Sequence, residues 1–238
     1  MRQRVKLSGK MVCLLVLLLV PMLLAAGDRA EFINLGFSDD GSIFLYGQYG
    51  KDAEGRYLYA DIIAHSIDED RRVDELTISR QYPIRQFSGQ SGVNALLMSL
   101  REHASSHALP INYTNTGSVL FFQLPGQDAG ELVTFTDYAD MTLYTVSLTI
   151  RPKEREPGTN ATIQLTLFRE LRNGTKSRFS TGSLLEPLEG VYEFHIKQVV
   201  LSPDRTKIVI VIQTRVFNEE DGDEDYRYTV YAMPLDKQ

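Results

Sequence analysis

Short apolar runs separated by polar turns predict β-strands over most of the chain. Glu31–Phe37 and Ile43–Tyr49 flank a turn in which Asp40 precedes Gly41. An Asp-Gly pair supplies the positive φ that a tight hairpin turn needs. Because consecutive short strands usually pair, these runs and the next ones predict one antiparallel sheet. The following strands are expected at Tyr57–Ile67 and Val73–Ser79, with a turn at Asp68–Asp70 between them.

One segment departs from this pattern and predicts a helix over Ser91–Leu109. Its apolar residues recur at helical spacing. Ser91 is a suitable N-cap, and Pro110 would stop the helix just after its end. The apolar stripe expected to face the core consists of Val93, Leu96, Leu97, Leu100 and Ala104.

Strand patterns resume after the helix. Thr142–Ile150 alternates between apolar and hydroxyl side chains, which is typical of a strand with one solvated face. Ile208–Ile212 is apolar at every position, which predicts a strand in a sheet that is covered on both faces. Arg151–Asn160 is charged and contains Pro and Gly, so an exposed loop is expected there. The remaining strands are expected at Ser118–Leu124, Leu132–Thr136, Thr162–Phe168, Val191–Leu201, Lys207–Thr214 and Tyr226–Met233.

A short internal repeat relates two of the predicted hairpins. Phe37–Phe44 is similar to Leu201–Ile208 at an offset of 164 residues, with Ser, Asp and a hydroxyl residue at matching turn positions. Arg205 stands where Gly41 stands in the first copy. A non-glycine residue in a left-handed conformation costs roughly 1 kcal/mol, so a different turn type is expected in the second copy.

The repeat bears on the fold class. Such hairpins resemble those between adjacent strands of β-propeller blades, as in periplasmic TolB-like repeats. About eleven strands are expected, fewer than a closed propeller of four-stranded blades needs. The sequence therefore predicts a mainly β fold of antiparallel, blade-like sheets packed face to face, as a sandwich or a partial propeller, with one inserted helix around residues 91–109.

The N-terminus has the three-part layout of a secretory signal peptide. Four basic residues precede the apolar run Met11–Leu24, and the small residues Ala25, Ala26 and Gly27 follow it. The run is shorter than the roughly 20 apolar residues of a spanning helix and contains Pro21. Cleavage is expected after Ala26 or Gly27, the alternative being an uncleaved anchor. This predicts a signal peptide at 1–27, a single β-rich domain at 28–238, and a secreted or periplasmic location without further membrane contact.

The first part of the predicted mature chain carries a resemblance. Gly27–Ser42 and Tyr46–Gly50 are similar to a bacterial family of predicted secreted proteins of unknown function. The similarity extends through Tyr59–Ile62, the predicted helix Ser91–Leu109, Val199–Thr214 and the acidic, aromatic segment Phe217–Tyr231. The resemblance implies export and a β-rich fold. It implies no activity and no catalytic residue.

Charge and cysteine content exclude several classes of function. After residue 27 the chain has 21 basic and 31 acidic residues, a net charge of −10. Such a protein repels phosphate backbones, so no nucleic-acid partner is expected. The only cysteine, Cys13, lies in the signal peptide. The mature chain therefore has no disulfide, no cysteine nucleophile and no cysteine zinc site.

Two clusters could bind a metal ion. His103 and His107 are four residues apart on the predicted helix, but a third ligand from His65, His195 or a carboxylate would be needed. Packing at the border of the helix is the preferred interpretation. The second cluster is Glu219–Asp225, where Asp221, Asp223 and Asp225 alternate as calcium ligands often do. A solvated hairpin loop between Val216 and Tyr226 is preferred there, with weak calcium binding or docking of a basic partner as alternatives.

No residue pattern predicts a catalytic site or a cofactor. Ser91 lies in Gly89–Gly92, where Val93 replaces the second glycine of a nucleophile elbow. We therefore expect an exported, non-enzymatic module that binds a protein or peptide in the cell envelope. The alternative is a hydrolase whose carboxylates meet only in space. A buried carboxyl with a raised pKa in a pocket would favour the hydrolase, whereas an open edge strand or flat apolar face would favour the binder.

Overall fold

The computed structural model describes residues 28–87, 91–106, 115–124, 130–152, 157, 159–218 and 223–235. Three antiparallel sheets account for most of them. Sheet I contains β1 (Glu31–Phe37), β2 (Ile43–Lys51), β3 (Tyr57–Ser66), β4 (Arg71–Arg72) and β5 (Ile78–Pro83). Sheet II contains β6 (Ser118–Phe122), β11 (Val191–Leu201), β12 (Lys207–Asn218) and β13 (Asp223–Pro234). Sheet III contains β7 (Leu132–Asp137), β8 (Thr142–Arg151), β9 (Thr162–Glu170) and β10 (Lys176–Ser183).

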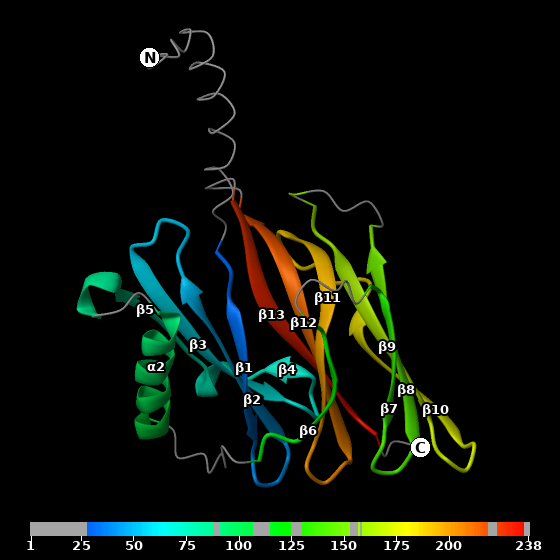
Figure 1. The fold of residues 1–238 in the computed structure, drawn as a ribbon. Coiled ribbons are helices and arrows are strands. Elements are labelled where there is room, and N and C mark those ends of the chain that lie inside the picture. The colour runs from blue at the N-terminus through cyan, green and yellow to red at the C-terminus, as the bar shows by residue number, and fades with distance from the viewer. Residues whose placement is uncertain are drawn as a thin grey trace, which may run out of the picture.

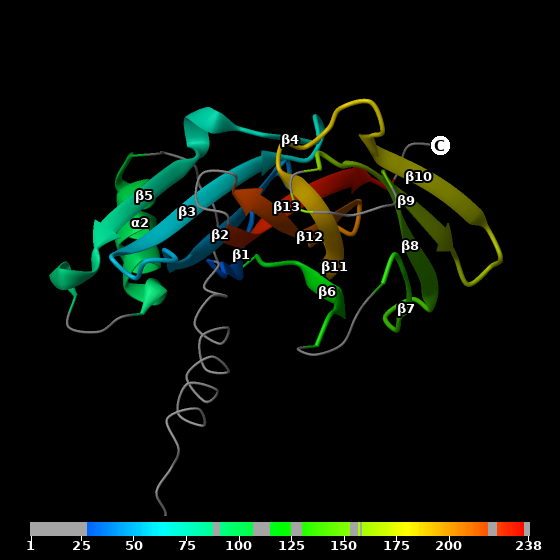
Figure 2. The same ribbon diagram turned by 90° about the horizontal axis from the view of Figure 1, so that it is seen from above.

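The sheets follow one another in a row, and helix α2 (Gly92–Ser106) covers the outer face of sheet I (Figures 1 and 2). One hydrophobic cluster lies between α2 and sheet I, a second between sheets I and II, and a third between sheets II and III. The strand order is β1-β2-β3-β4 in sheet I, with β5 also pairing with β3, β13-β12-β11-β6 in sheet II and β10-β9-β8-β7 in sheet III. The predicted fold class of antiparallel sheets packed together with one helix is confirmed.

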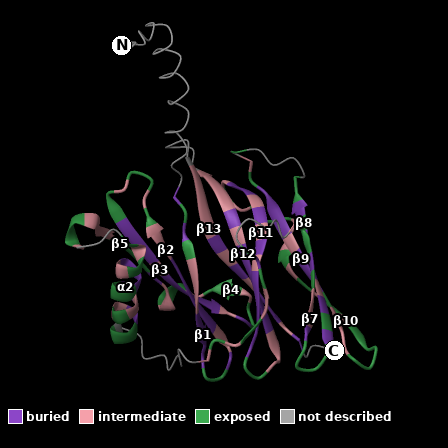
Figure 3. Ribbon diagram, viewed as in Figure 1, coloured by how far each residue is buried: buried purple, intermediate pink, exposed green. Residues whose placement is uncertain are grey.

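Strand β12 explains why sheet II lies in the middle. Ile208, Ile210 and Ile212 are buried against sheet III, while Val209 and Val211 are buried against sheet I. Burying one such side chain contributes about 1.5–3 kcal/mol. The prediction that this strand is covered on both faces is confirmed. Figure 3 shows buried residues along the strands that form the sheets.

The free edge of β13 is closed by groups from the first part of the chain. The backbone N–H of Tyr226 donates to the carbonyl of Asp28 at 2.8 Å, and that of Tyr228 donates to Gln48 Oε1 at 3.0 Å. Farther along, the N–H of Ala232 donates to Asp70 Oδ1 at 2.7 Å. Unpaired edge groups are templates for further strand pairing. These contacts therefore block strand addition at β13 and fasten sheet I to sheet II.

Helix α2 begins as predicted but buries a different face. The hydroxyl of Ser91 accepts the N–H of Val93 at 3.3 Å, as expected of an N-cap. Val93 and Leu97, however, are 42% and 58% exposed. Ala104 is exposed as well, so the predicted stripe is wrong at these three positions, because polar side chains take their place on the buried face. The buried face consists of Ala95, Leu96, Ser99 and His103, with Leu100 half-buried.

Two strand predictions also need correction. A strand was expected at Val73–Ser79, but Asp74–Leu76 forms a short 3-10 helix and β5 runs from Ile78 to Pro83. Strand β10 was not predicted at all. Its residues alternate between exposed and half-buried positions, so no apolar run identifies it. The other predicted strands are present, with ends shifted by a few residues.

Candidate functional site

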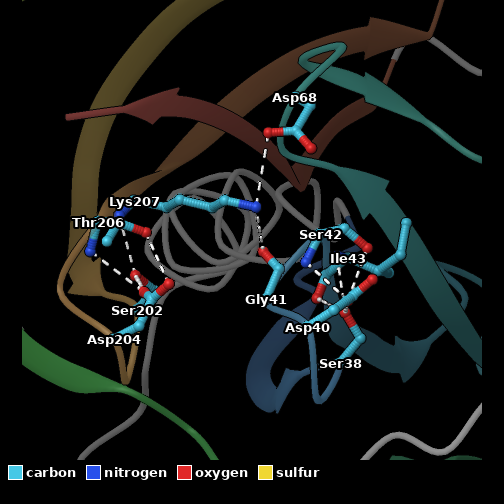
Figure 4. Close-up of polar contacts among 10 residues, drawn as sticks. All are labelled: Ser38, Asp40, Gly41, Ser42, Ile43, Asp68, Ser202, Asp204, Thr206 and Lys207. Atoms are coloured by element: carbon cyan, nitrogen blue, oxygen red, sulfur yellow. Dashed lines mark hydrogen bonds and ion pairs between the residues drawn. The ribbon is translucent and has the colours of Figure 1, made fainter. Parts of the chain in front are cut away.

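The two repeated hairpin turns adopt nearly the same structure, at the end of the stack opposite the start of β1 (Figures 1 and 4). Ser38 Oγ donates to Asp40 Oδ1 at 2.6 Å, and Ser202 Oγ donates to Asp204 Oδ1 at 2.5 Å. The hydroxyl of Ser38 also accepts the N–H of Ile43 at 2.9 Å. The matching contact in the second turn joins Ser202 Oγ to the N–H of Lys207, also at 2.9 Å.

Arg205 takes the left-handed conformation of Gly41, with φ of 62° against 66°. The expected change of turn type is therefore wrong. The guanidinium of Arg205 bonds both Asp137 and Asp140 of the β7–β8 turn, the latter at 2.9 Å. These contacts offset the roughly 1 kcal/mol cost of the backbone conformation. Lys207 Nζ donates to the Gly41 carbonyl at 3.0 Å, so all three sheets are linked at this end.

The turn carboxylates are stabilised in their ionised form. Hydrogen bonds from the Ser38 hydroxyl, and then from the N–H and hydroxyl of Ser42, lower the pKa of Asp40 to about 2. Burial alone would raise the pKa of Asp204, but bonds from Ser202 and Thr206 lower it. Since a lowered carboxyl pKa adds stability above the unfolded value of about 3.9, this contribution is lost as the pH falls from 4 toward 2. We interpret the turns as structural links between the sheets.

Replacing Gly41 by valine is expected to destabilise the protein by about 1–2 kcal/mol. A Cβ at Gly41 would meet no atom closer than Asp204 Oδ2 at 3.9 Å, so the cost comes from the positive φ and not from a clash. Urea melts would measure the loss. The exposed neighbour Asp39→Ala is the control and should stay within about 0.5 kcal/mol of wild type. Equal stability of the Gly41→Val and wild-type proteins would contradict the assigned role of φ.

A pocket of about 550 Å³ lies at the other end of the stack, where sheet I meets the beginning of β13. The β2–β3 loop, β3, β5 and β13 all contribute to its wall. Four carboxylates and two guanidinium groups line it. They belong to Asp28, Asp52, Asp61, Asp225, Arg80 and Arg227.

A buried ion pair forms one wall of the pocket. Arg227 donates to Asp28 Oδ2 at 2.8 Å and to Asp225 Oδ2 at 3.1 Å. The hydroxyl of Tyr59 donates to Asp28 Oδ1 at 2.7 Å, and the guanidinium of Arg227 lies 5.1 Å from the centre of the Tyr59 ring. Asp28 is only 6% exposed. Both of its carboxylate oxygens are therefore engaged by neighbouring side chains.

Burial sets the protonation of this wall. Desolvation raises the pKa of Asp28, and the charge of Arg227 is the largest influence that lowers it. Burial likewise raises the pKa of Tyr59 far above its usual range, so the phenol stays protonated and remains a donor. The wall thus combines one buried carboxyl, one cation and one neutral hydroxyl.

Two further carboxylates of the lining are held by neutral donors. Gln48 Nε2 donates to Asp61 Oδ2 at 2.8 Å, and the Ser79 hydroxyl donates to Asp61 Oδ1. Asp52 accepts the backbone N–H groups of Arg56 and Tyr57 at 2.7 and 2.8 Å. These bonds orient the two carboxylates but bring no positive charge to them.

The charges around the pocket do not balance. Arg227 faces Asp28 and Asp225, while the Arg80 Nε donates to Glu102 of α2 at 3.0 Å. The two cations thus pair with carboxylates, one of which lies outside the lining. The bonds described for Asp52 and Asp61 come from neutral donors, and those described for Arg80 and Arg227 go to other carboxylates. The arrangement is suited to a positively charged ligand group.

The predicted acidic loop is shorter than expected. Strand β12 continues to Asn218 and β13 begins at Asp223, so Asp225 lies in a strand. Its carboxylate bonds Arg227 and the backbone N–H of Asp28, the latter at 3.0 Å. Placing Asp225 in a solvated loop beside Asp221 and Asp223 was therefore wrong. Residues 219–222 and the side chain of Asp223 lie outside the described residues, so the alternative of weak calcium binding stays untested.

The histidines have separate environments. His103 is buried, with Nε2 3.0 Å from the Leu76 carbonyl, which corrects its expected place at the helix border. His65 Nε2 lies 2.9 Å from Asp70, and His195 Nε2 lies 3.0 Å from Glu193. His107 lies outside the described residues, as do the predicted cleavage residues Ala26 and Gly27. Within the described ranges, no group of three or more His, Cys, Asp or Glu side chains is arranged to hold a metal ion.

Comparisons with known proteins give no match, either to a family model or to a curated protein. The resemblance to secreted bacterial proteins with TolB-like hairpins therefore stays a prediction. In the described part of the chain, no helix is long and apolar enough to cross a membrane.

Proposed function

We propose that the protein is an exported, non-enzymatic binding module of the cell envelope that receives a basic polypeptide segment in its acidic pocket. The observation that carries this proposal is the pair of carboxylates, Asp52 and Asp61, held in place by neutral donors at the wall of the pocket. A lysine or arginine side chain of the partner would supply the missing positive charge. The net charge of −10 after residue 27 favours the same class of partner, because it attracts basic segments over longer distances.

Strand β5 borders the pocket and offers a place for an extended segment. Three residues of β5 line the pocket: Ser79, Arg80 and Gln81. Strand β5 pairs with β3. An extended chain lying along β5 would bring its side chains toward Asp61, the cross-strand partner of Ser79. Main-chain contacts with a strand provide affinity in this mode of recognition, and the pocket provides specificity. Strand addition at β13 is not part of the proposal, because that edge is already occupied.

A hydrolase is the second candidate, because the pKa of the buried Asp28 carboxyl is raised inside a pocket. A general acid or base must lie within hydrogen-bond reach of the substrate. Tyr59 and Arg227 already occupy the two oxygens of Asp28. This arrangement favours a structural ion pair over an acid-base catalyst, so we prefer the binding module.

Replacing Asp61 by asparagine is expected to weaken binding of a basic peptide about fivefold to tenfold. In Asp61→Asn the amide oxygen can still accept from Gln48 and the amide NH2 can donate to the Ser79 hydroxyl, but the charge is lost. One partly desolvated ion pair contributes about 1–1.4 kcal/mol. Titration calorimetry with a lysine-rich and a glutamate-rich peptide of equal length would measure it. We expect the lysine-rich peptide to bind more weakly as salt increases, since salt screens the charges.

Asp39→Asn is the matched control, because it removes the same charge at an exposed turn on the opposite end of the stack. It should leave peptide affinity unchanged. The proposal fails if the wild-type protein does not distinguish the two peptides, or if Asp61→Asn and Asp39→Asn bind the lysine-rich peptide equally well.

A further inference from the structure

Asp28 directly follows the predicted cleavage residue Gly27, yet every polar group of Asp28 is engaged. Its backbone nitrogen donates to Asp225 Oδ1 at 3.0 Å, and its carbonyl accepts the N–H of Tyr226 at 2.8 Å. Tyr59 and Arg227 hold its carboxylate. With 6% exposure, Asp28 is fixed inside the fold at the wall of the pocket.

The geometry points to Asp28 as the first residue of the mature protein, with its new α-ammonium group forming an ion pair with Asp225. Cleavage is a hydrolysis by the endopeptidase that processes exported chains. Water adds its hydroxyl to the carbonyl carbon of Gly27 and its proton to the nitrogen of Asp28 as the peptide bond between them breaks. At neutral pH the new carboxyl group of Gly27 gives up its proton and the amine of Asp28 takes one up, which leaves a carboxylate and an ammonium group. This inference rests on the predicted signal peptide 1–27 and not on the binding proposal.

At the nitrogen of Asp28, a new terminal charge would meet the carboxylate of Asp225. As a peptide group this nitrogen carries a single N–H and no net charge. As an ammonium group it carries three N–H donors and a full positive charge, and charge-assisted hydrogen bonds are roughly twice as strong as neutral ones. A chain beginning at Gly27 would place its ammonium one residue away, with consecutive Cα atoms about 3.8 Å apart. The sequence alone leaves open whether cleavage occurs after Ala26 or after Gly27. The contact between the Asp28 nitrogen and Asp225 favours cleavage after Gly27.

Processing at this point would also change the pocket. Asp225 already accepts a bond from Arg227 through its second oxygen at 3.1 Å. The ammonium group of Asp28 would add a second cation beside Asp225. The negative charge left for a partner would then be concentrated at Asp52 and Asp61 of the lining.

Sequencing of the N-terminus, with an intact mass, tests the position of cleavage. The full chain with its own leader would be expressed in bacteria and the protein recovered from the cell envelope. We expect it to begin at Asp28. A protein that begins at Gly27, or that keeps residues 1–27, overturns the inference.

A second experiment tests the ion pair. Chains that begin at Asp28 and at Gly27 would be compared by thermal melting, each with Asp225 and with Asp225→Asn. At pH 7 the Asp28 form should melt about 2–4 °C higher, and the difference should vanish in the Asp225→Asn pair. Because an α-ammonium group loses its proton near pH 8, its contribution is present below that pH and should fade by pH 9.5.

Equal melting temperatures of the two wild-type forms at pH 7 would overturn the inference, and so would a difference that survives at pH 9.5 or in the Asp225→Asn pair. The pH comparison needs no substitution, so it decides the matter even if Asp225→Asn fails to fold. Neither experiment uses a peptide ligand. Their failure is therefore distinguishable from failure of the proposed binding function.

Discussion

Replacing Asp70 by alanine is expected to destabilise the protein by about 3–5 kcal/mol, because this one carboxylate joins all three sheets. Its Oδ1 lies 2.9 Å from His65 Nε2 of sheet I and accepts the N–H of Ala232 of sheet II at 2.7 Å. Its Oδ2 accepts the hydroxyl of Thr181 of sheet III. Alanine would leave these three groups without their acceptor, and each buried unsatisfied group costs about 1–3 kcal/mol.

Backbone conformation adds to this effect. Asp70 has φ of 48°, a left-handed conformation that Asp and Asn tolerate better than alanine does. Asp70→Asn should therefore cost no more than about 1.5 kcal/mol, since the amide oxygen can still accept from His65 and Ala232. Urea melts at pH 7, followed by two probes, would measure both variants.

The nearby Asp68→Ala is the control for the loss of a charge on this turn. Asp68 is exposed and lies 3.5 Å from Lys207, and such a surface ion pair is worth about 0–1 kcal/mol. If Asp70→Ala is no less stable than Asp68→Ala, the carboxylate does not hold the sheets together.

Alternation of apolar residues was enough to predict most strands, since burial of a strand face requires it. Strand β10 escaped because it is an edge strand with a single large apolar residue, Phe179. The signal that could have found it is the Asn173-Gly174 pair, which forms a tight turn with Gly174 at φ of 84°. The N–H of Leu171 donates to the carbonyl of Thr175 across this turn.

The buried face of α2 could not be predicted by counting apolar residues. Ser99 lies 3.1 Å from the Tyr82 hydroxyl, and His103 lies 3.0 Å from the Leu76 carbonyl. Polar side chains can be buried when a hydrogen bond replaces their contact with water. Those partners belong to the segment before the helix, so they cannot be predicted from the sequence of the helix itself.

The residues that form the pocket could not be predicted from the sequence, for a related reason. Asp28 and Arg227 are 199 positions apart and meet only because β13 packs against sheet I. Asp225 and its acidic neighbours favoured a solvated loop by composition, whereas pairing with Val216 places Asp225 in a strand. Asp28, which contacts both Asp225 and Arg227, lies at the far end of the chain from them.

Replacing Arg227 by methionine is expected to destabilise the protein by about 3–5 kcal/mol at pH 7. Methionine keeps most of the apolar volume of the side chain but removes the cation that faces Asp28. Removing one partner of a buried ion pair leaves an uncompensated charge, which is more costly than losing both partners. Adding Asp28→Asn to the variant should therefore recover much of the lost stability.

The deficit of Arg227→Met should depend on pH in a defined direction. Burial already raises the pKa of Asp28, and loss of Arg227 raises it further because the main influence that lowers it is gone. A carboxyl with a raised folded-state pKa contributes stability at low pH, and that contribution is lost as the pH rises through the folded-state value. The deficit should thus be small near pH 4 and grow toward pH 7. Urea melts at pH 4, 5 and 7 would measure it, with Arg56→Met at an exposed position as the control. A deficit that is equal at pH 4 and pH 7, or one that Asp28→Asn does not reduce, would mean that Arg227 acts through packing on Tyr59 and not through the charge of Asp28.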